Sequence, residues 1–168
     1  QEMTVAIVGL GLIGGSVGLA LRCHGWATRL LGIDANHAHA AEALARGLVD
    51  ELTTLEDGLA DADCILLAIP VDVIGQLLPP ILDKIGPHQV VIDLGSTKQA
   101  IAQAVATHPA RTRYVAAHPM AGTERSGPAA ALADLFHNRV AILCDIERSA
   151  PDTRLCAENL FRDGLGMR

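Results

Sequence analysis

The sequence predicts an α/β fold in which a doubly wound, mostly parallel sheet has helices on both faces. Apolar runs of strand length alternate with helix-length segments along the chain, and the connections between them are short. Half of the residues are apolar but only 2% are aromatic, so the core must consist of Leu, Ile, Val and Ala. That composition is typical of a parallel sheet buried between helices.

Length and charge limit the classes of protein that fit. The 168 residues suit one domain. The formal net charge is −6 and no basic block occurs, so we expect no nucleic-acid partner. No apolar run is long enough to span a membrane, so we expect a soluble, cytoplasmic protein with no membrane partner. The four cysteines lack CxxC spacing and no other residues have the spacing of metal ligands, so we expect reduced thiols and no metal site.

The chain is organised around a strand, a glycine turn and a helix. Residues 4–8 form an apolar run of strand length, and an apolar-periodic stretch follows at residues 12–23. Between them, Gly9 permits a tight turn, and Gly11 lets the backbone approach a pyrophosphate because it has no Cβ. Gly14 lets the helix lie close to the strand. The alternative is a tight turn whose glycines serve no ligand.

The start of this helix is the expected phosphate site, because free N–H groups and the helix dipole favour an anion there. We therefore include the backbone of Leu12 and Ile13 among the cofactor-binding groups. A second strand, residues 29–33, ends at Asp34, which lies 20 residues after Gly14. At that distance a carboxylate meets the ribose hydroxyls of a dinucleotide. The pattern predicts a Rossmann-type domain that binds NAD in preference to NADP, since Asp34 would repel a 2′-phosphate.

The middle of the chain continues the alternation. The run that ends at Ala68, Ile69 and Pro70 is mostly apolar, which indicates a strand buried on both faces. Open α/β sheets bind ligands at the carboxyl ends of their strands, so we expect these three residues to line the cofactor; the alternative is a plain strand end. Pro79 and Pro80 should break or kink the helix that follows. The expected elements are a helix at 37–46, a strand at 48–53, a helix at 55–60, a strand at 62–70 and a helix at 71–85.

The last third of the chain has three more strands. Ser96 is well placed as the N-cap of the helix that follows the first of them. Residues 164–168 resemble a helix end that turns toward one more strand, so we expect residues 1–168 to be a dinucleotide-binding domain that stops before its last strand. The expected elements are strands at 89–94, 114–117 and 139–144, and helices at 95–107, 129–136 and 151–162.

Two of these strand ends carry groups that could perform chemistry. Ser96 follows the strand at 89–94, and His118 follows the strand at 114–117, so both should lie at the carboxyl edge of the sheet. Hydride transfer from an alcohol needs a group that receives the hydroxyl proton, and histidine suits that role near neutral pH. Ser96 could orient the histidine or the hydroxyl. The alternative is that Ser96 only caps a helix and His118 is only a polar residue before a proline.

Three motifs, in this order and spacing, resemble the prephenate/arogenate dehydrogenase family of tyrosine biosynthesis. They are GLGLIGGS at residues 9–16, DLGSTK at residues 93–98 and HPMAGTERSG at residues 118–127. The first motif occurs in many dehydrogenases, whereas the third is much narrower. The resemblance covers essentially the whole chain.

The resemblance implies an NAD-dependent oxidative decarboxylation of a cyclohexadienyl substrate. A hydride leaves the ring carbon that bears the 4-hydroxyl, carbon dioxide leaves from the opposite carbon, and aromatisation drives the step. His118 matches the residue that accepts the hydroxyl proton. Ser96 matches the residue that bridges that histidine, the hydroxyl and the nicotinamide. Thr123 and Glu124 match positions near the substrate.

The resemblance also implies that something is missing from this chain. Members of the family carry an all-helical C-terminal domain that dimerises and supplies further substrate-binding groups. We therefore expect a homodimer at full length and poor activity from this chain alone. Prephenate is the expected substrate and arogenate the alternative. A related 3-hydroxyacid or imine reductase, and a non-catalytic NAD(H)-binding regulatory module, remain further alternatives.

Overall fold

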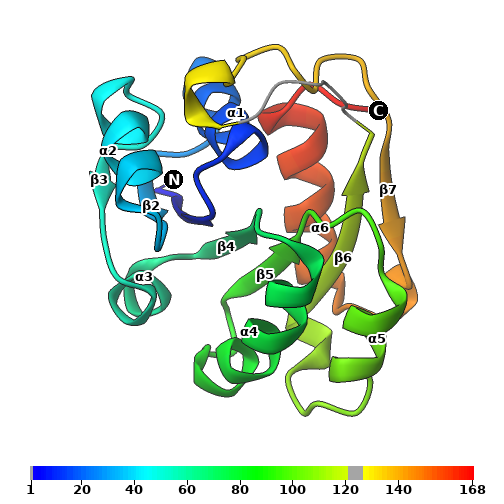
Figure 1. The fold of residues 1–168 in the computed structure, drawn as a ribbon. Helices are drawn as coiled ribbons and strands as arrows, with labels where there is room; N and C mark the ends of the chain where they lie inside the picture. Colours follow the sequence, from blue (N-terminus) through cyan, green and yellow to red (C-terminus); the bar gives the residue numbers. More distant parts are fainter. Residues whose placement is uncertain (1, 121–126) are drawn as a thin grey trace.

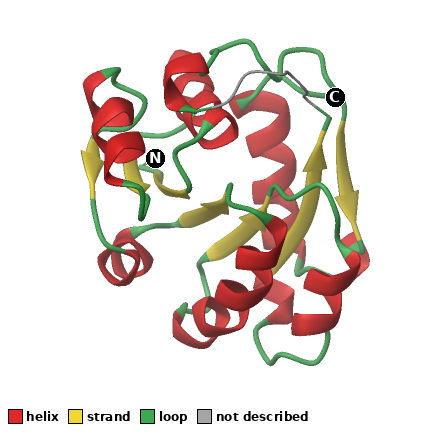
Figure 2. Cartoon of the chain, in the orientation of Figure 1, coloured by secondary structure: helices red, strands yellow, loops and turns green. Residues whose placement is uncertain are grey.

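The computed structural model describes residues 2–120 and 127–168, which form one seven-stranded sheet with helices on both faces (Figure 1 and Figure 2). The strands are β1 (Thr4–Val8), β2 (Arg29–Ile33), β3 (Glu51–Leu52), β4 (Cys64–Leu67), β5 (Val90–Asp93), β6 (Tyr114–Pro119) and β7 (Ala141–Cys144). The α-helices are α1 (Leu12–Cys23), α2 (His37–Ala45), α3 (Leu55–Asp61), α4 (Val71–Lys84), α5 (Gln99–Val105) and α6 (Pro151–Asn159). Shorter helical turns are η1 (Arg111–Arg113), η2 (Pro128–Ala130), η3 (Ile146–Arg148) and the π-helical η4 (Leu160–Gly164).

The strand order is β3-β2-β1-β4-β5-β6-β7. The chain builds the sheet outward from β1 to β3, crosses back to β4, and then builds it in the other direction. β1 to β6 are parallel, and β7 is antiparallel to β6. The predicted doubly wound, mostly parallel sheet is therefore confirmed. Its consequence for function is that β1, β4, β5 and β6 all end at the same edge of the sheet.

The side chains of the central strands alternate between two apolar layers. Val5 and Ile7 of β1 pack into a layer with α1, α2 and α6, whereas Ala6 and Val8 pack into a layer with α3, α4 and α5. All four residues of β4 are buried. Burial on both faces explains why the central strands read as nearly continuous apolar runs in the sequence.

In two segments of the fold, packing overrides a local signal. The prolines Pro79 and Pro80 were expected to break or kink α4. The helix runs through both prolines as one helix, so it is not broken, and a kink stays a prediction. Its apolar face, which includes Ile74 and Leu78, is buried against the sheet. This packing holds the helix although each proline removes a main-chain hydrogen bond.

The predicted helix at 129–136 is replaced by η2 and turns. The guanidinium of Arg46, at the end of α2, donates to the carbonyl oxygens of Pro128 and Ala131. The N–H of Leu132 donates to Ser16 Oγ of α1 at 3.0 Å. Contacts with two distant helices therefore satisfy backbone groups that a local helix would otherwise pair.

Candidate functional site

The three glycines of the turn after β1 have three different surroundings. Gly9 has a φ of +100°, and a Cβ there would lie 2.3 Å from the carbonyl oxygen of Ala68. A Cβ on the buried Gly14 would lie 1.8 Å from the carbonyl oxygen of Gly9. A Cβ on Gly11 would meet nothing within 4 Å. Gly9 and Gly14 therefore allow close packing of the chain on itself, whereas the open side of Gly11 is available to a ligand.

The N-terminus of α1 has the character of an anion site. Its N-cap is Gly11, which has no side chain that could accept from the first turn. The first N–H groups of a helix have no partner within the helix, so those of Leu12 and Ile13 are available to a phosphate. The structure thus places the predicted residues at one helix end beside the turn.

Asp34 lies immediately after β2 and is half-buried. Its Oδ2 accepts from the N–H of Leu10 at 2.7 Å, and its Oδ1 accepts from the N–H of Asn36 at 2.8 Å. The carboxylate also lines a cleft of about 670 Å³ with His37 and Thr54 among its other walls. Each carboxylate oxygen has acceptor capacity left for a ribose hydroxyl.

A second cleft, of about 420 Å³, lies where β4, β5 and β6 end. The residues that line it are Ile13, Ala68, Ile69, Pro70, Val71, Leu94, Gly95, Ser96, His118 and Pro119. The structure therefore brings together the N-terminus of α1, the end of β4 and both candidate catalytic side chains. The predicted residues Thr123 and Glu124 lie outside the described residues.

Ser96 does not cap a helix, which corrects the prediction. α5 begins at Gln99, and its N-cap is Lys98, which makes no capping hydrogen bond through its side chain. Ser96 is exposed in the loop between β5 and α5, and it lines the cleft. The residue therefore lies at the wall of the cleft and not at the start of the helix.

His118 is the fifth residue of the six-residue β6, which extends past the predicted end at Ala117. It is half-buried and pairs in register with Ile142 of β7. Because side chains on one strand alternate between faces, Met120 shares the face of His118. Met120 and Ile142 are both exposed, so the imidazole lies at the edge of an apolar surface.

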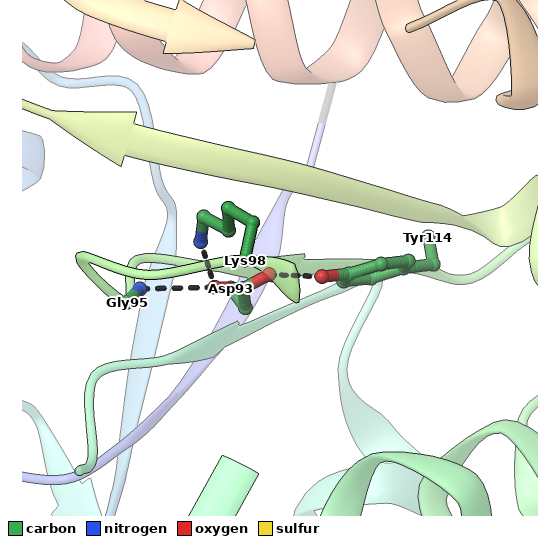
Figure 3. A network of polar contacts seen from close by, with 4 residues as sticks. All are labelled: Asp93, Gly95, Lys98 and Tyr114. Atoms are coloured by element: carbon green, nitrogen blue, oxygen red, sulfur yellow. Dashed lines mark hydrogen bonds and ion pairs between the residues drawn. The ribbon is translucent and has the colours of Figure 1, made fainter. Parts of the chain in front are cut away.

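A group of residues to which the sequence analysis gave no role, although Asp93 and Lys98 stand in its second motif, lies directly beneath this loop (Figure 3). Asp93, at the end of β5, is fully buried, and its carboxylate accepts from the N–H of Gly95, from Lys98 Nζ and from the hydroxyl of Tyr114. Burial lowers the pKa of the Lys98 ammonium, and the attraction of Asp93 opposes that shift. Burial and the negative Asp93 raise the pKa of the Tyr114 hydroxyl, which stays protonated and can donate. The available signal was an acidic residue inside an otherwise apolar strand.

Among residues 2–120 and 127–168, no group of three or more His, Cys, Asp or Glu side chains could hold a metal ion. No helix in that part of the chain has both the length and the apolar character needed to cross a membrane. The chemistry of the described residues is that of a cradle for an anionic dinucleotide beside one imidazole and one hydroxyl.

A parallel sheet with the order 3-2-1-4-5-6, a glycine turn at a helix N-terminus and an acid after β2 define a dinucleotide-binding domain of the dehydrogenase class. A family model described as "Prephenate dehydrogenase, nucleotide-binding domain" matches residues 17–166. The chain therefore belongs to the prephenate dehydrogenase family, and it corresponds to the nucleotide-binding domain of that family.

Individual relatives agree with this assignment. Prephenate dehydrogenase of Bacillus subtilis is 37% identical over 143 residues, which are 83% of this chain and 38% of that protein. Cyclohexadienyl dehydrogenase of Zymomonas mobilis is 31% identical over 83% of this chain and 48% of its own length. The chain thus spans less than half the length of these two relatives.

Solved structures show the same relationship. Prephenate dehydrogenase of Aquifex aeolicus, in complex with hydroxyphenyl propionate and NAD+, has a TM-score of 0.89 and 27% identity over 100% of this chain and 59% of that chain. Arogenate dehydrogenase of Synechocystis has a TM-score of 0.86 and 31% identity over 99% of this chain and 58% of its own.

Proposed function

We propose that this chain binds NAD and carries the proton-accepting part of the active site of a prephenate dehydrogenase. The observation that best supports the proposal is that Ser96 and His118 line one cleft together with Ile13 and the end of β4. The complex of the Aquifex relative with NAD+ and hydroxyphenyl propionate supports both the cofactor and a phenolic product. Because the chain spans only part of its relatives, the reaction is proposed for the full-length protein.

The described residues fit the cofactor at its pyrophosphate and at its adenosine ribose. The open side of Gly11 and the N–H groups at the start of α1 would hold the pyrophosphate. Asp34 would accept from the ribose hydroxyls and disfavour a 2′-phosphate. When bound, NAD supplies the acceptor for the hydride that leaves the ring carbon bearing the 4-hydroxyl.

In this mechanism His118 is the general base. One of its ring nitrogens accepts the proton of the 4-hydroxyl as the hydride leaves that carbon, and it returns a proton to the same oxygen once carbon dioxide has left, because the phenol product carries a hydroxyl hydrogen. Ser96 orients the hydroxyl and the imidazole from the neighbouring strand end. The carboxylate on the opposite ring carbon leaves as carbon dioxide, and the ring becomes aromatic. Thr123 and Glu124 are proposed substrate contacts.

The deciding experiment is turnover by the full-length protein. It should form NADH in the presence of prephenate and release carbon dioxide and 4-hydroxyphenylpyruvate in equal amounts. Arogenate should be assayed in parallel, because the Synechocystis relative is an arogenate dehydrogenase. Binding of NAD without turnover of either substrate would contradict the proposal and favour a non-catalytic regulatory module.

We also propose that the full-length protein is a cytoplasmic homodimer. All four cysteines are free thiols, which is typical of a reducing compartment. The apolar side chains beside His118 are exposed in this chain, which supports a contact there with a further part of the protein or with a second subunit.

A further inference from the structure

The buried carboxylate of Asp93 accepts hydrogen bonds from three donors. An ionised carboxylate without water is strongly unfavourable unless charges and hydrogen bonds compensate it. Here Oδ1 accepts from the N–H of Gly95 at 2.9 Å and from Lys98 Nζ, and Oδ2 accepts from the hydroxyl of Tyr114 (Figure 3). Both oxygens are therefore used, and each of the three donors is fixed in direction by a buried acceptor.

Two of the three donors lie on either side of Ser96 in the sequence. Gly95 precedes it, and Lys98 follows it by two residues, so one carboxylate holds both sides of the loop. The loop is also closely packed at Gly95, where a Cβ would lie 3.2 Å from side-chain atoms of Val71 and Ile74 in α4. A loop held at both sides by one buried group has little freedom to move Ser96.

The third donor connects this loop with the strand of His118. Tyr114 is the first residue of β6 and is fully buried, and the guanidinium of Arg111 lies 4.9 Å from the centroid of its ring. Asp93 itself pairs in register with Ala116, two residues before His118. Because strand side chains alternate, Tyr114, Ala116 and His118 share one face of β6.

We propose that Asp93, Lys98 and Tyr114 form a positioning unit that holds the Ser96 loop against the strand of His118 and so sets the place of Ser96 relative to the imidazole. The three residues touch neither substrate nor cofactor in this role; they act through Ser96. The inference rests on the proposed function for its effect on catalysis, but not for its effect on the loop.

The test uses the full-length protein and two variants. Lys98→Gln removes the charge and shortens the side chain that reaches Asp93, and Tyr114→Phe removes the donating hydroxyl. The first readout is hydrogen exchange by mass spectrometry over residues 93–98. Either substitution should speed exchange of the Gly95 N–H, with β1 and β4 unchanged. Unchanged exchange at residues 93–98 in both variants would overturn the proposal, whether or not the protein proves to be an enzyme.

The second readout is a double-mutant cycle with Ser96→Ala. Lys98→Gln alone should lower kcat by about 10- to 100-fold, the range expected when a reacting group is misplaced by about 1 Å, with little change in NAD affinity. In the Ser96→Ala background, Lys98→Gln should lower kcat by no more than about two-fold, because the effects of residues that act as a unit are not additive. Lys98→Arg keeps the donor and the charge and should restore most of kcat. Independent, multiplicative effects of Lys98→Gln and Ser96→Ala would contradict the positioning role.

Asp152→Asn is a matched control, because it removes the ion pair in which Asp152 accepts from Arg113 Nη1 at 2.9 Å, away from the cleft. The effect of Asp152→Asn on kcat should multiply with the effect of Ser96→Ala, so this double-mutant cycle should show no coupling. Absence of turnover in the wild-type protein, together with faster exchange in Lys98→Gln, would refute the proposed function and leave the positioning unit standing.

Discussion

Asp34 accepts a hydrogen bond from the backbone N–H of Leu10 at 2.7 Å, across 24 residues of sequence. Leu10 lies in the glycine turn between Gly9 and Gly11, so one carboxylate fixes the turn that would hold the pyrophosphate and also faces the cleft proposed for the adenosine. The two halves of the cofactor site therefore depend on the same side chain.

Asp34→Ser should weaken NAD binding and reduce the preference for NAD over NADP. The serine is too short to take over both hydrogen bonds, and it removes the charge that disfavours a 2′-phosphate. A hydrogen bond to a charged group contributes about 1.5–3 kcal/mol, so NAD affinity should fall by about 10- to 100-fold. Titration of both cofactors measures the effect, and Asp34→Asn, which keeps the size, is the control. Equal or tighter binding of NADP by the wild-type protein would contradict this specificity.

Gly14→Ala should lower the stability of the fold, whereas Gly11→Ala should weaken NAD binding. The methyl group of the first would lie 1.8 Å from the Gly9 carbonyl oxygen, so the backbone must shift, and we expect a loss of at least about 1–3 kcal/mol of stability. The methyl group of the second would meet nothing within 4 Å, so stability should hold while NAD binding weakens. Urea unfolding and NAD titration of both variants measure the difference. Equal destabilisation by the two substitutions would show that Gly11 is not open to a ligand.

The sequence predicted the elements well where the signal is local. The bounds of β1, α1 and β2 agree with the structure, because an apolar run, a glycine turn and a periodic helix specify them within 30 residues. The same local logic placed Ser96 and His118 at the ends of neighbouring parallel strands. The roles of the site residues themselves remain predictions.

Long-range contacts could not be seen in local patterns. Ser96 looked like a helix cap, but the loop is instead held by Asp93, whose partner Tyr114 lies 21 residues away. The expected helix at 129–136 fails because Arg46, 82 residues before Pro128, holds that carbonyl oxygen. Such interactions depend on the completed sheet, which brings distant residues together only after the topology is set.

The chain on its own should self-associate through the apolar face beside His118. Met120, Val140 and Ile142 are 47%, 44% and 46% exposed, and the pairing of β6 with β7 places them on one surface. Val140→Thr combined with Ile142→Thr should shift the chain toward monomer in sedimentation experiments. Leu155→Thr, at an exposed apolar position of α6, is the control and should have no effect. A wild-type chain that stays monomeric at high concentration would refute this use of the surface.

His118→Asn tests the proposed chemistry directly. If the imidazole accepts the hydroxyl proton, it must be neutral, so the activity of the full-length protein should fall on the acid side with one apparent ionisation. Asparagine keeps a hydrogen-bonding group of similar size but cannot act as the base, and kcat should fall by about 10²- to 10⁴-fold. Ser96→Ala should cost less, because the serine orients and does not accept the proton. NAD affinity should hardly change in either variant, since the pyrophosphate and ribose contacts are proposed at Gly11, α1 and Asp34. Near-normal kcat in His118→Asn, with the acid limb still in place, would mean that the histidine is structural and that another group takes the proton.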